Sequence, residues 1–225
     1  MKISAIILAA GKSERMGENK LSLLYNGKTL LQYVFDLIGK MDLHECILVI
    51  SSGNAKELGI NKNVKLLKNV NLSGDFVQLE DVTQPIDMAH NGKLPIKVVY
   101  NKHVEMGQSY SVKLGIEEAS SEGYLFMAGD QPLLTEELIC DIIYHAKYDK
   151  IVFPLDGNGN PSNPTFFGGA FKNELLSLEG DVGGRYIRDK FTESCIPITT
   201  NYPEQLMDID NQKTYKQLLD MTNIV

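Results

Sequence analysis

The sequence predicts an α/β fold: a single three-layer, Rossmann-like domain built on a mostly parallel (mixed) β-sheet. Short runs rich in Ile and Val alternate along the chain with stretches whose apolar residues recur at helical spacing. The first runs are apolar at consecutive positions, which is typical of parallel strands covered on both faces. A chain of 225 residues with 43% hydrophobic residues can bury a sizeable core, so we expect one domain over residues 1–225, although two small domains would also fit this length.

The candidate strands are the short apolar runs. The first, residues 3–9, is too short to span a membrane, which takes roughly 20 residues, and the single Lys2 before it makes a poor signal peptide. We therefore expect a buried first strand and no membrane association. The other candidate strands are residues 45–51, 64–70, 96–101, 123–129, 150–154, 164–168 and 193–199.

The candidate helices lie between these runs. Residues 29–41 place several apolar side chains on one helical face: Leu30, Leu31, Val34, Phe35 and Ile38. Thr135, followed by two glutamates, is typical of a helix N-cap with acids in the first turn. Helices are also expected at residues 109–120, 135–147, 171–178 and 212–221.

Residues 71–94 break the alternation. They have weak periodicity and scattered acidic residues. Long irregular segments in compact domains are usually functional or disordered, so we expect an irregular insertion that is either a flap over the site or a mobile loop.

Composition excludes some classes of protein. A net charge of −7 argues against a nucleic-acid-binding protein, because such proteins need a broad basic face. Cys46, Cys140 and Cys195 are odd in number, far apart and without metal-ligand spacing, which favours a cytoplasmic protein without disulfides. A local basic site on an acidic protein suits a small anionic ligand.

The loop after the first strand reads LAAGKSERMGENK. It lacks the G-x-G-x-x-G order of a dinucleotide fingerprint and the Lys-Ser/Thr pair that ends a P-loop. It still combines backbone N–H groups with Lys12, Arg15 and Lys20, which together could neutralise a polyphosphate. A solvated loop that happens to contain basic residues is the alternative.

Acidic residues follow two later segments. Asp130 ends an apolar run, so its carboxylate should reach the sheet edge where α/β proteins bind ligands and where Mg²⁺ could join it to phosphate oxygens. Its alternative role is a turn-forming residue before Pro132. Asp208 and Asp210, two residues apart on an extended segment, could face one ion together, or one of them could cap the following helix.

In combination, these motifs resemble the MobA-like nucleotidyltransferases. The opening loop matches their L-A-A-G-x-S-x-R-M-G-x-x-K signature. Later blocks follow in the family's order: NKHVEMGQSYSVKLGI, AGDQPLLT, NPSNPTFFG, EGDVGGRYI and DIDNQKTY. The resemblance covers most of the chain apart from residues 71–94, and it implies a nucleotidyltransferase domain. Within the family, L-A-A-G is similar to the molybdenum cofactor cytidylyltransferases, whereas the guanylyltransferases usually carry L-A-G-G.

The resemblance implies a role for each matching residue. The base and ribose of the nucleotide would lie along Leu8, Ala9, Ala10 and Gly11. Its phosphates would be held by Ser13, Arg15 and Lys20, of which Arg15 and Lys20 would act in catalysis together with Asp130. Mg²⁺ would be ligated by Asp130 and Asp210, with Asp208 in reserve. The acceptor side would include Ser109, Asp181 and Arg185.

The implied reaction transfers CMP from CTP to the terminal phosphate of molybdopterin carrying molybdenum, and releases pyrophosphate. A phosphate is already an anionic nucleophile, which agrees with four scattered histidines that form no catalytic arrangement. A molybdoenzyme could receive the product. The alternatives are a GTP-using guanylyltransferase, a nucleotidyltransferase acting on a sugar or polyol phosphate, a nucleotide-sugar glycosyltransferase and a non-catalytic nucleotide-binding or cofactor-delivery protein.

Two features bear on specificity. The methyl group of Ala10 would narrow the base slot toward a pyrimidine. The chain departs from the family at Ser162-Asn163-Pro164, where Gly-His-Pro or Gly-Asn-Pro is common, and at residues 208–213, where D-x-D-T-P-E is usual.

Overall fold

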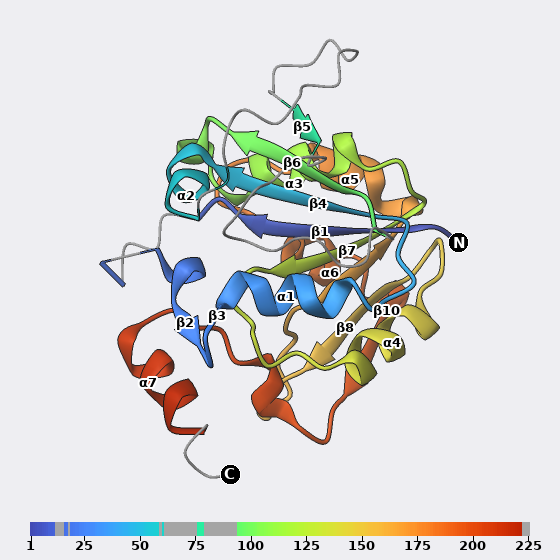
Figure 1. Ribbon diagram of the computed structural model, residues 1–225. Helices are drawn as coiled ribbons and strands as arrows, with labels where there is room; N and C mark the ends of the chain where they lie inside the picture. The colour runs from blue at the N-terminus through green and yellow to red at the C-terminus, as the bar shows by residue number, and fades with distance from the viewer. Residues whose placement is uncertain (12–15, 18, 59, 61–75, 79–93, 222–225) are drawn as a thin grey trace.

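The computed structural model describes residues 1–11, 16–17, 19–58, 60, 76–78 and 94–221. Its centre is an eight-stranded sheet in the order β10-β8-β9-β7-β1-β4-β6-β5 (Figure 1). The strands are β1 Ile3–Ala9, β4 Glu45–Ser51, β5 Phe76–Gln78, β6 Ile96–Asn101, β7 Gly123–Ala128, β8 Ile151–Leu155, β9 Thr165–Gly168 and β10 Cys195–Thr199. β2 (Leu24–Tyr25) and β3 (Lys28–Thr29) form a separate antiparallel hairpin.

The sheet is mixed but mostly parallel, as the sequence predicts. β1 pairs in parallel with both β4 and β7, β4 with β6, and β8 with β10. β9 runs antiparallel between β7 and β8, and β5 runs antiparallel to β6. The predicted strand at residues 64–70 lies outside the described residues.

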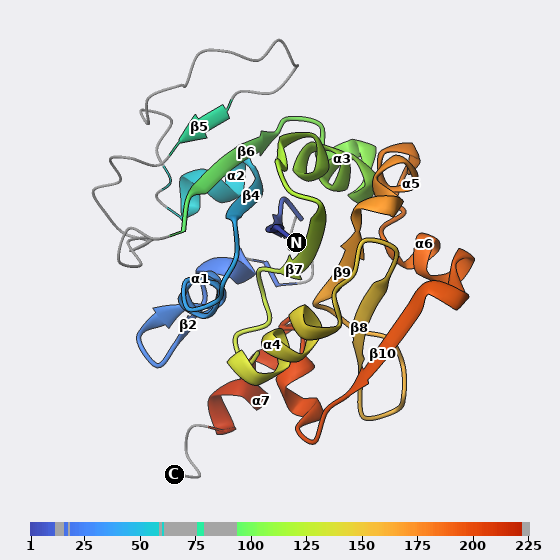
Figure 2. The same cartoon turned by 90° about the vertical axis from the view of Figure 1, so that its right-hand side faces the viewer.

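Helices cover both faces of the sheet, which gives three layers (Figure 2). Side chains alternate along β1, so Ile7 packs in the core beneath α1 and α4, while Ile6 packs in the core beneath α3 and α5. The first face carries α1 (Leu30–Ile38), α2 (Ser52–Glu57) and α4 (Glu136–His145). The second face carries α3 (Gln108–Glu118), α5 (Lys172–Ser177) and α6 (Arg185–Lys190). The last helix is α7 (Gln212–Met221).

The remaining regular elements are single 3-10 turns. They are η1 Lys20–Ser22, η2 Val104–Met106, η3 Gly169–Phe171, η4 Thr192–Ser194 and η5 Pro203–Leu206. The η4 turn delays the start of β10, which begins two residues after the predicted strand. Thr135 caps α4 as predicted, because its side chain accepts a hydrogen bond from the N–H of Leu138.

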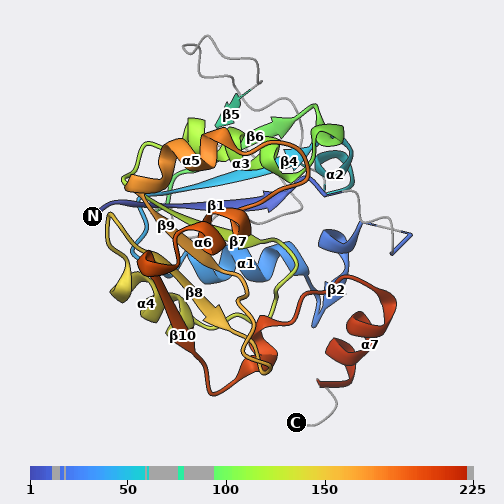
Figure 3. The same cartoon turned by 180° about the vertical axis from the view of Figure 1, so that it is seen from behind.

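A small third core fastens the two ends of the chain together. The β2–β3 hairpin and α7 lie side by side (Figures 1 and 3). The shared core consists of Met16, Leu23, Tyr25, Leu30, Ile209 and Leu218. The segment before α7 is therefore held beside elements from the start of the chain.

The predicted insertion at residues 71–94 contains one described strand, β5, which extends the sheet beyond β6. Residues 71–75 and 79–93 lie outside the described residues. A flap over the site stays a prediction.

Candidate active site

The carboxyl ends of β1 and β7 open into one large cavity, because neighbouring parallel strands end at the same edge of the sheet. Its volume is about 890 Å³. One part of its wall combines the end of β1 with a charged cluster: Leu8, Ala9, Gly11, Lys20, Asp130, Asp208 and Asp210. Another part comes from α6 and the loop before it, including Asp181 and Arg185.

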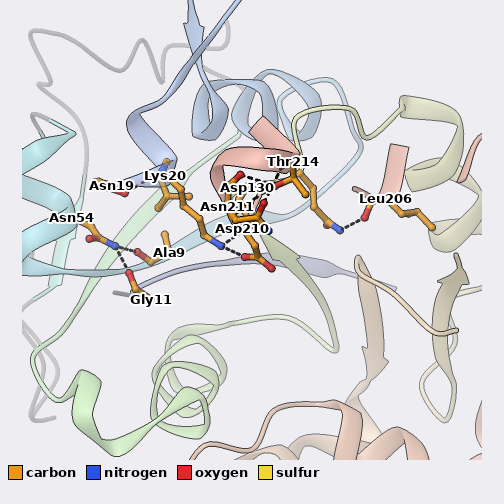
Figure 4. A network of polar contacts seen from close by, with 12 residues as sticks. Ala9, Gly11, Asn19, Lys20, Asn54, Asp130, Leu206, Asp210, Asn211 and Thr214 are labelled. Carbon is orange, nitrogen blue, oxygen red and sulfur yellow. Dashed lines mark hydrogen bonds and ion pairs between the residues drawn. The ribbon is translucent and has the colours of Figure 1, made fainter. Parts of the chain in front are cut away.

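Lys20 lies between two carboxylates from distant parts of the chain. Its Nζ is 2.6 Å from Oδ1 of Asp210, and it also forms an ion pair with Asp130 (Figure 4). Asn19 fixes the turn that carries Lys20, because its side-chain oxygen accepts a hydrogen bond from the N–H of Leu21. The structure therefore brings together Lys20, Asp130 and Asp210, which the sequence predicts for one site.

A backbone contact explains why Asp210 reaches Asp130. The N–H of Ile209 donates to the carbonyl of Asp130 at 3.1 Å, and the Ile209 side chain is fully buried in the third core. Asn211, rather than either aspartate, caps α7, because its side-chain oxygen accepts hydrogen bonds from two N–H groups of the first turn. Asp208 and Asp210 are not on a strand, but both face the cavity.

The acids outnumber the lysine at this end of the cavity, and the pKa values of Asp130, Asp208 and Lys20 are shifted. Burial raises the pKa of Asp130, while Lys20 opposes that rise. The surrounding protein desolvates the carboxyl group of Asp208, although the residue as a whole stays exposed. Desolvation and the nearby charges of Asp130 and Asp210 raise the pKa of Asp208 to about 7. Burial lowers the pKa of Lys20, but the two paired carboxylates offset it, so that the pKa lies above its ordinary value.

This surplus of carboxylate oxygens fits a hard divalent cation. Mg²⁺ binds through one or two carboxylates together with substrate phosphates, and Asp130 and Asp210 supply two such groups beside the open cavity. In the part of the chain that the structure describes, no group of three or more His, Cys, Asp or Glu residues could hold a metal ion. Nucleotide phosphates and water could supply the remaining ligands.

The first loop is fastened by a residue that the sequence analysis missed. The side-chain nitrogen of Asn54, on α2, donates to the carbonyls of Ala9 at 2.7 Å and Gly11 at 3.0 Å (Figure 4). Ala10 is only 6% exposed and does not line the described cavity, so its methyl group does not narrow that cavity as expected. Lys12, Ser13 and Arg15 lie outside the described residues.

The loop before α6 is tied to the start of α3. Oδ1 of Asp181 accepts a hydrogen bond from the N–H of Gln108 at 3.2 Å, and the carbonyl of Gly180 accepts one from the N–H of Ser109. Gly107 has a φ of +82°, and a Cβ there would lie 2.6 Å from the backbone of Gly180. Asp181 thus holds the loop in place. Ser109 is buried and does not line the described cavity, whereas Arg185 lines it with a side chain that is 83% exposed.

Comparison with protein families identifies the domain to which this chain belongs. Residues 5–194 match the MobA-like NTP transferase domain. The chain belongs to that family. The resemblance found in its motifs is therefore confirmed at the level of the family.

The relatives of this MobA-like domain include a protein named as a guanylyltransferase. A probable molybdenum cofactor guanylyltransferase from Natranaerobius thermophilus is 29% identical over 157 residues, which cover 68% of this chain and 60% of the relative. The chain thus spans less than two thirds of that relative's length.

Two solved structures share the fold. Rv0371c from Mycobacterium tuberculosis aligns with a TM-score of 0.69 at 21% identity, covering 98% of this chain and 99% of its own; it has also been solved as a complex with manganese. The 4-diphosphocytidyl-2C-methyl-D-erythritol synthase from Anaerococcus prevotii aligns with a TM-score of 0.69 at 18% identity, covering 99% and 96%. Among the described residues of our MobA-like domain, no helix is long and apolar enough to cross a membrane.

Three functional candidates of the MobA-like domain escaped the sequence analysis. Asn54 lies on a short, polar helix with no amphipathic pattern, and Arg188 lies on a six-residue helix after a glycine-rich loop. The role of Gln108 depends on a contact with Asp181, 73 residues away. The one usable signal for Asn54 was a polar residue three places after the helix cap Ser51, which ends an apolar strand.

Proposed function

We propose that this protein transfers CMP from CTP to the terminal phosphate of a molybdopterin-type cofactor and releases pyrophosphate. The observation that carries this proposal is the bridge from Lys20 to Asp130 and Asp210 at the end of β1 and β7, beside a cavity of about 890 Å³. A cavity of that volume is near the upper end of the range for small-molecule sites, which suits two substrates bound side by side.

Each group of residues would have its own task. The backbone from Leu8 to Gly11, which Asn54 holds in place, would lie along the base and ribose. Lys20 would neutralise charge on the triphosphate, together with Ser13 and Arg15 of the same loop. Asp130 and Asp210 would hold Mg²⁺, which supplies positive charge to the triphosphate oxygens as pyrophosphate leaves.

The acceptor needs no catalytic base, because a phosphate oxygen is already an anionic nucleophile. This agrees with the lining of the described cavity, which contains no histidine or cysteine. Catalysis would consist mainly of positioning and charge neutralisation, as is general for transfer at phosphorus. A molybdoenzyme that receives the product is the partner that this function implies.

The choice of CTP depends on the L-A-A-G sequence at residues 8–11. A guanylyltransferase is the second candidate, because a curated relative carries that name. Since the Ala10 side chain does not line the described cavity, Ala10→Gly should change the CTP-to-GTP preference only slightly, well below the roughly 10- to 200-fold that one methyl group can contribute in a binding pocket.

Pyrophosphate release tests the proposal. Each of the four NTPs is supplied with and without molybdopterin, and then CTP and GTP compete in one reaction. We expect release to require molybdopterin and CTP to be preferred by both the wild type and Ala10→Gly. A wild-type preference for GTP would favour the guanylyltransferase function. Pyrophosphate release that occurs only with a sugar or polyol phosphate would show that this compound, and not molybdopterin, is the acceptor.

A further inference from the structure

Arg188 is a nearly buried cation in the wall of the same cavity. Its side chain is 10% exposed, and its guanidinium stacks on the ring of Phe153 at 5.0 Å. Charged side chains are seldom buried without close partners, since desolvation of an unpaired charge is costly. The partners of Arg188 therefore decide what it can do.

The described residues offer Arg188 little compensation. Its guanidinium has one charged contact among them: Nε lies 3.4 Å from Oδ1 of Asp189, the next residue in the chain. A guanidinium carries five N–H donors. Most of this donor capacity is therefore available to a molecule in the cavity.

Arg185 adds a second positive charge. Its Nε is 3.6 Å from Oδ2 of Asp189, so that two guanidinium groups share one carboxylate. Asp181, the other acid nearby, already accepts a hydrogen bond at the start of α3. Two arginines and two aspartates thus share this part of the wall, whereas the part around Asp130 has one lysine and three aspartates, an excess of negative charge.

The two parts of the wall are separated across the sheet. Arg188 stacks on a residue of β8, Asp130 follows β7, and β9 lies between these strands. Adjacent strands are about 4.8 Å apart, so the separation across the sheet is about 10 Å. A larger acceptor with charged groups at both ends could therefore contact both parts of the wall.

We infer that Arg188 and Arg185 form an anion subsite for a second negatively charged group of the acceptor, apart from the phosphate that reacts. This inference depends on the proposed function in one respect, namely that the acceptor occupies this cavity. It narrows the acceptor to molecules with two anionic groups. A polyol phosphate with a single charged group would leave the subsite empty.

Binding of inorganic phosphate tests the subsite without the acceptor. The protein is first saturated with CTP, or with GTP if it binds only that, and phosphate is then titrated by calorimetry. We expect wild type to bind phosphate and Arg188→Gln to bind it about 10- to 100-fold more weakly, the scale of losing charge-assisted hydrogen bonds. Arg188→Lys should restore part of the affinity.

Lys190→Gln is the matched control, because Lys190 lies on the same helix but does not line the cavity. It should bind phosphate as wild type does. If Arg188→Gln does not fold, the exposed Arg185→Gln serves instead, and its phosphate affinity should fall. Unchanged phosphate binding in the folded arginine variants, or no binding by wild type, would overturn the subsite.

Kinetics with molybdopterin provide a second readout. Arg188→Gln should raise KM for the acceptor and leave KM for the nucleotide unchanged. If the proposed function is wrong, wild type will release no pyrophosphate with molybdopterin. The phosphate titration still tests the subsite in that case, because it does not use the acceptor.

Discussion

A lysine–carboxylate cluster lies near each end of β1, and the two clusters differ in how completely the carboxylates are bonded. At the amino end, Oε1 of Glu45 accepts hydrogen bonds from Ser4 and from both the N–H and hydroxyl of Ser120, while Oε2 pairs with Lys97 at 2.9 Å. At the carboxyl end, Lys20 faces three aspartates that line an open cavity.

The pKa values express this difference. Burial would raise the pKa of Glu45, but the hydrogen bonds from Lys97, Ser120 and Ser4 lower it to about 2. Asp208 at the other end moves the opposite way, to about 7. A saturated carboxylate stabilises the fold, whereas crowded carboxylates with spare oxygens are suited to a cation, which could in turn bind phosphates. The same residue types thus have different surroundings at the two ends of one strand.

The largest expected effect is the loss of catalysis in Asp130→Asn. Losing one carboxylate at the proposed metal position should lower the rate of pyrophosphate release by about 10³-fold, the upper range for removing one electrostatic stabiliser. The fold should persist, because burial already disfavours the charged form of Asp130. Steady-state kinetics and circular dichroism measure both.

Glu45→Gln is the control for Asp130→Asn, since it alters the cluster around Glu45, in which both carboxylate oxygens have partners. It should be less stable yet retain turnover. Near-normal turnover in Asp130→Asn would contradict the proposed catalytic role of the cluster around Asp130. Asp210→Asn should resemble Asp130→Asn, with more residual activity, because Asp210 is the more exposed of the two carboxylates paired with Lys20.

Lys20→Ala should have the next largest effect. Its rate should fall by about 10²- to 10³-fold, because the cation beside the triphosphate is lost. Lys40→Ala removes an exposed lysine that pairs with Glu136 at 2.6 Å, and it should leave the rate unchanged. Comparable, small effects in both variants would indicate that Lys20 forms an ordinary surface ion pair.

Acid should reduce the stability that the cluster around Glu45 contributes to the fold. Because the pKa of Glu45 is about 2 in the folded protein and 4.5 in the unfolded chain, the unfolded chain binds a proton first as the pH falls. The stability from ionised Glu45 is thus complete above pH 4.5 and is lost as the pH falls toward 2. It is about 3 kcal/mol, from 1.36 kcal/mol per pKa unit.

Urea unfolding of wild type and Glu45→Gln between pH 7 and pH 3 measures this contribution. The difference in the free energy of unfolding should be largest near neutral pH and shrink in acid. A difference that does not depend on pH would mean that the ionised form of Glu45 is not what stabilises the fold.

The smallest effect should come from Asn54→Ala. Losing hydrogen bonds to the carbonyls of Ala9 and Gly11 should raise KM for the nucleotide by about 10-fold, as two ordinary hydrogen bonds would, with less change in kcat. Asn54→Asp should be worse, because a carboxylate repels both carbonyls. Ser52→Ala, on the exposed side of the same helix, should bind nucleotide normally. Equal KM values for all three variants would contradict the role of Asn54.

The sequence predicts the parts of this molecule that depend on local pattern. Continuous apolar runs locate β1 and β4 to the residue, and the motif around Asp130 points to the correct sheet edge. Contacts between distant segments are not encoded in any local pattern. The cap that Asp181 provides to α3 and the anchoring of Ala9 by Asn54 each depend on tertiary packing. The preference for CTP stays a prediction; Ala10 does not line the described cavity, because a sequence motif does not fix the direction of a side chain.

The hydrogen bond from Ile209 to Asp130 also has a consequence for the order of biosynthesis. A ribosome releases Lys20 and Asp130 long before Asp210, so the growing chain can build most of its sheet while the charged cluster is still incomplete. The small core that docks α7 forms only afterwards, from residues separated by nearly the whole sequence. Contacts of such long range form slowly because they close large loops. In the proposed function, the site would therefore be completed only when α7 docks against the β2–β3 hairpin.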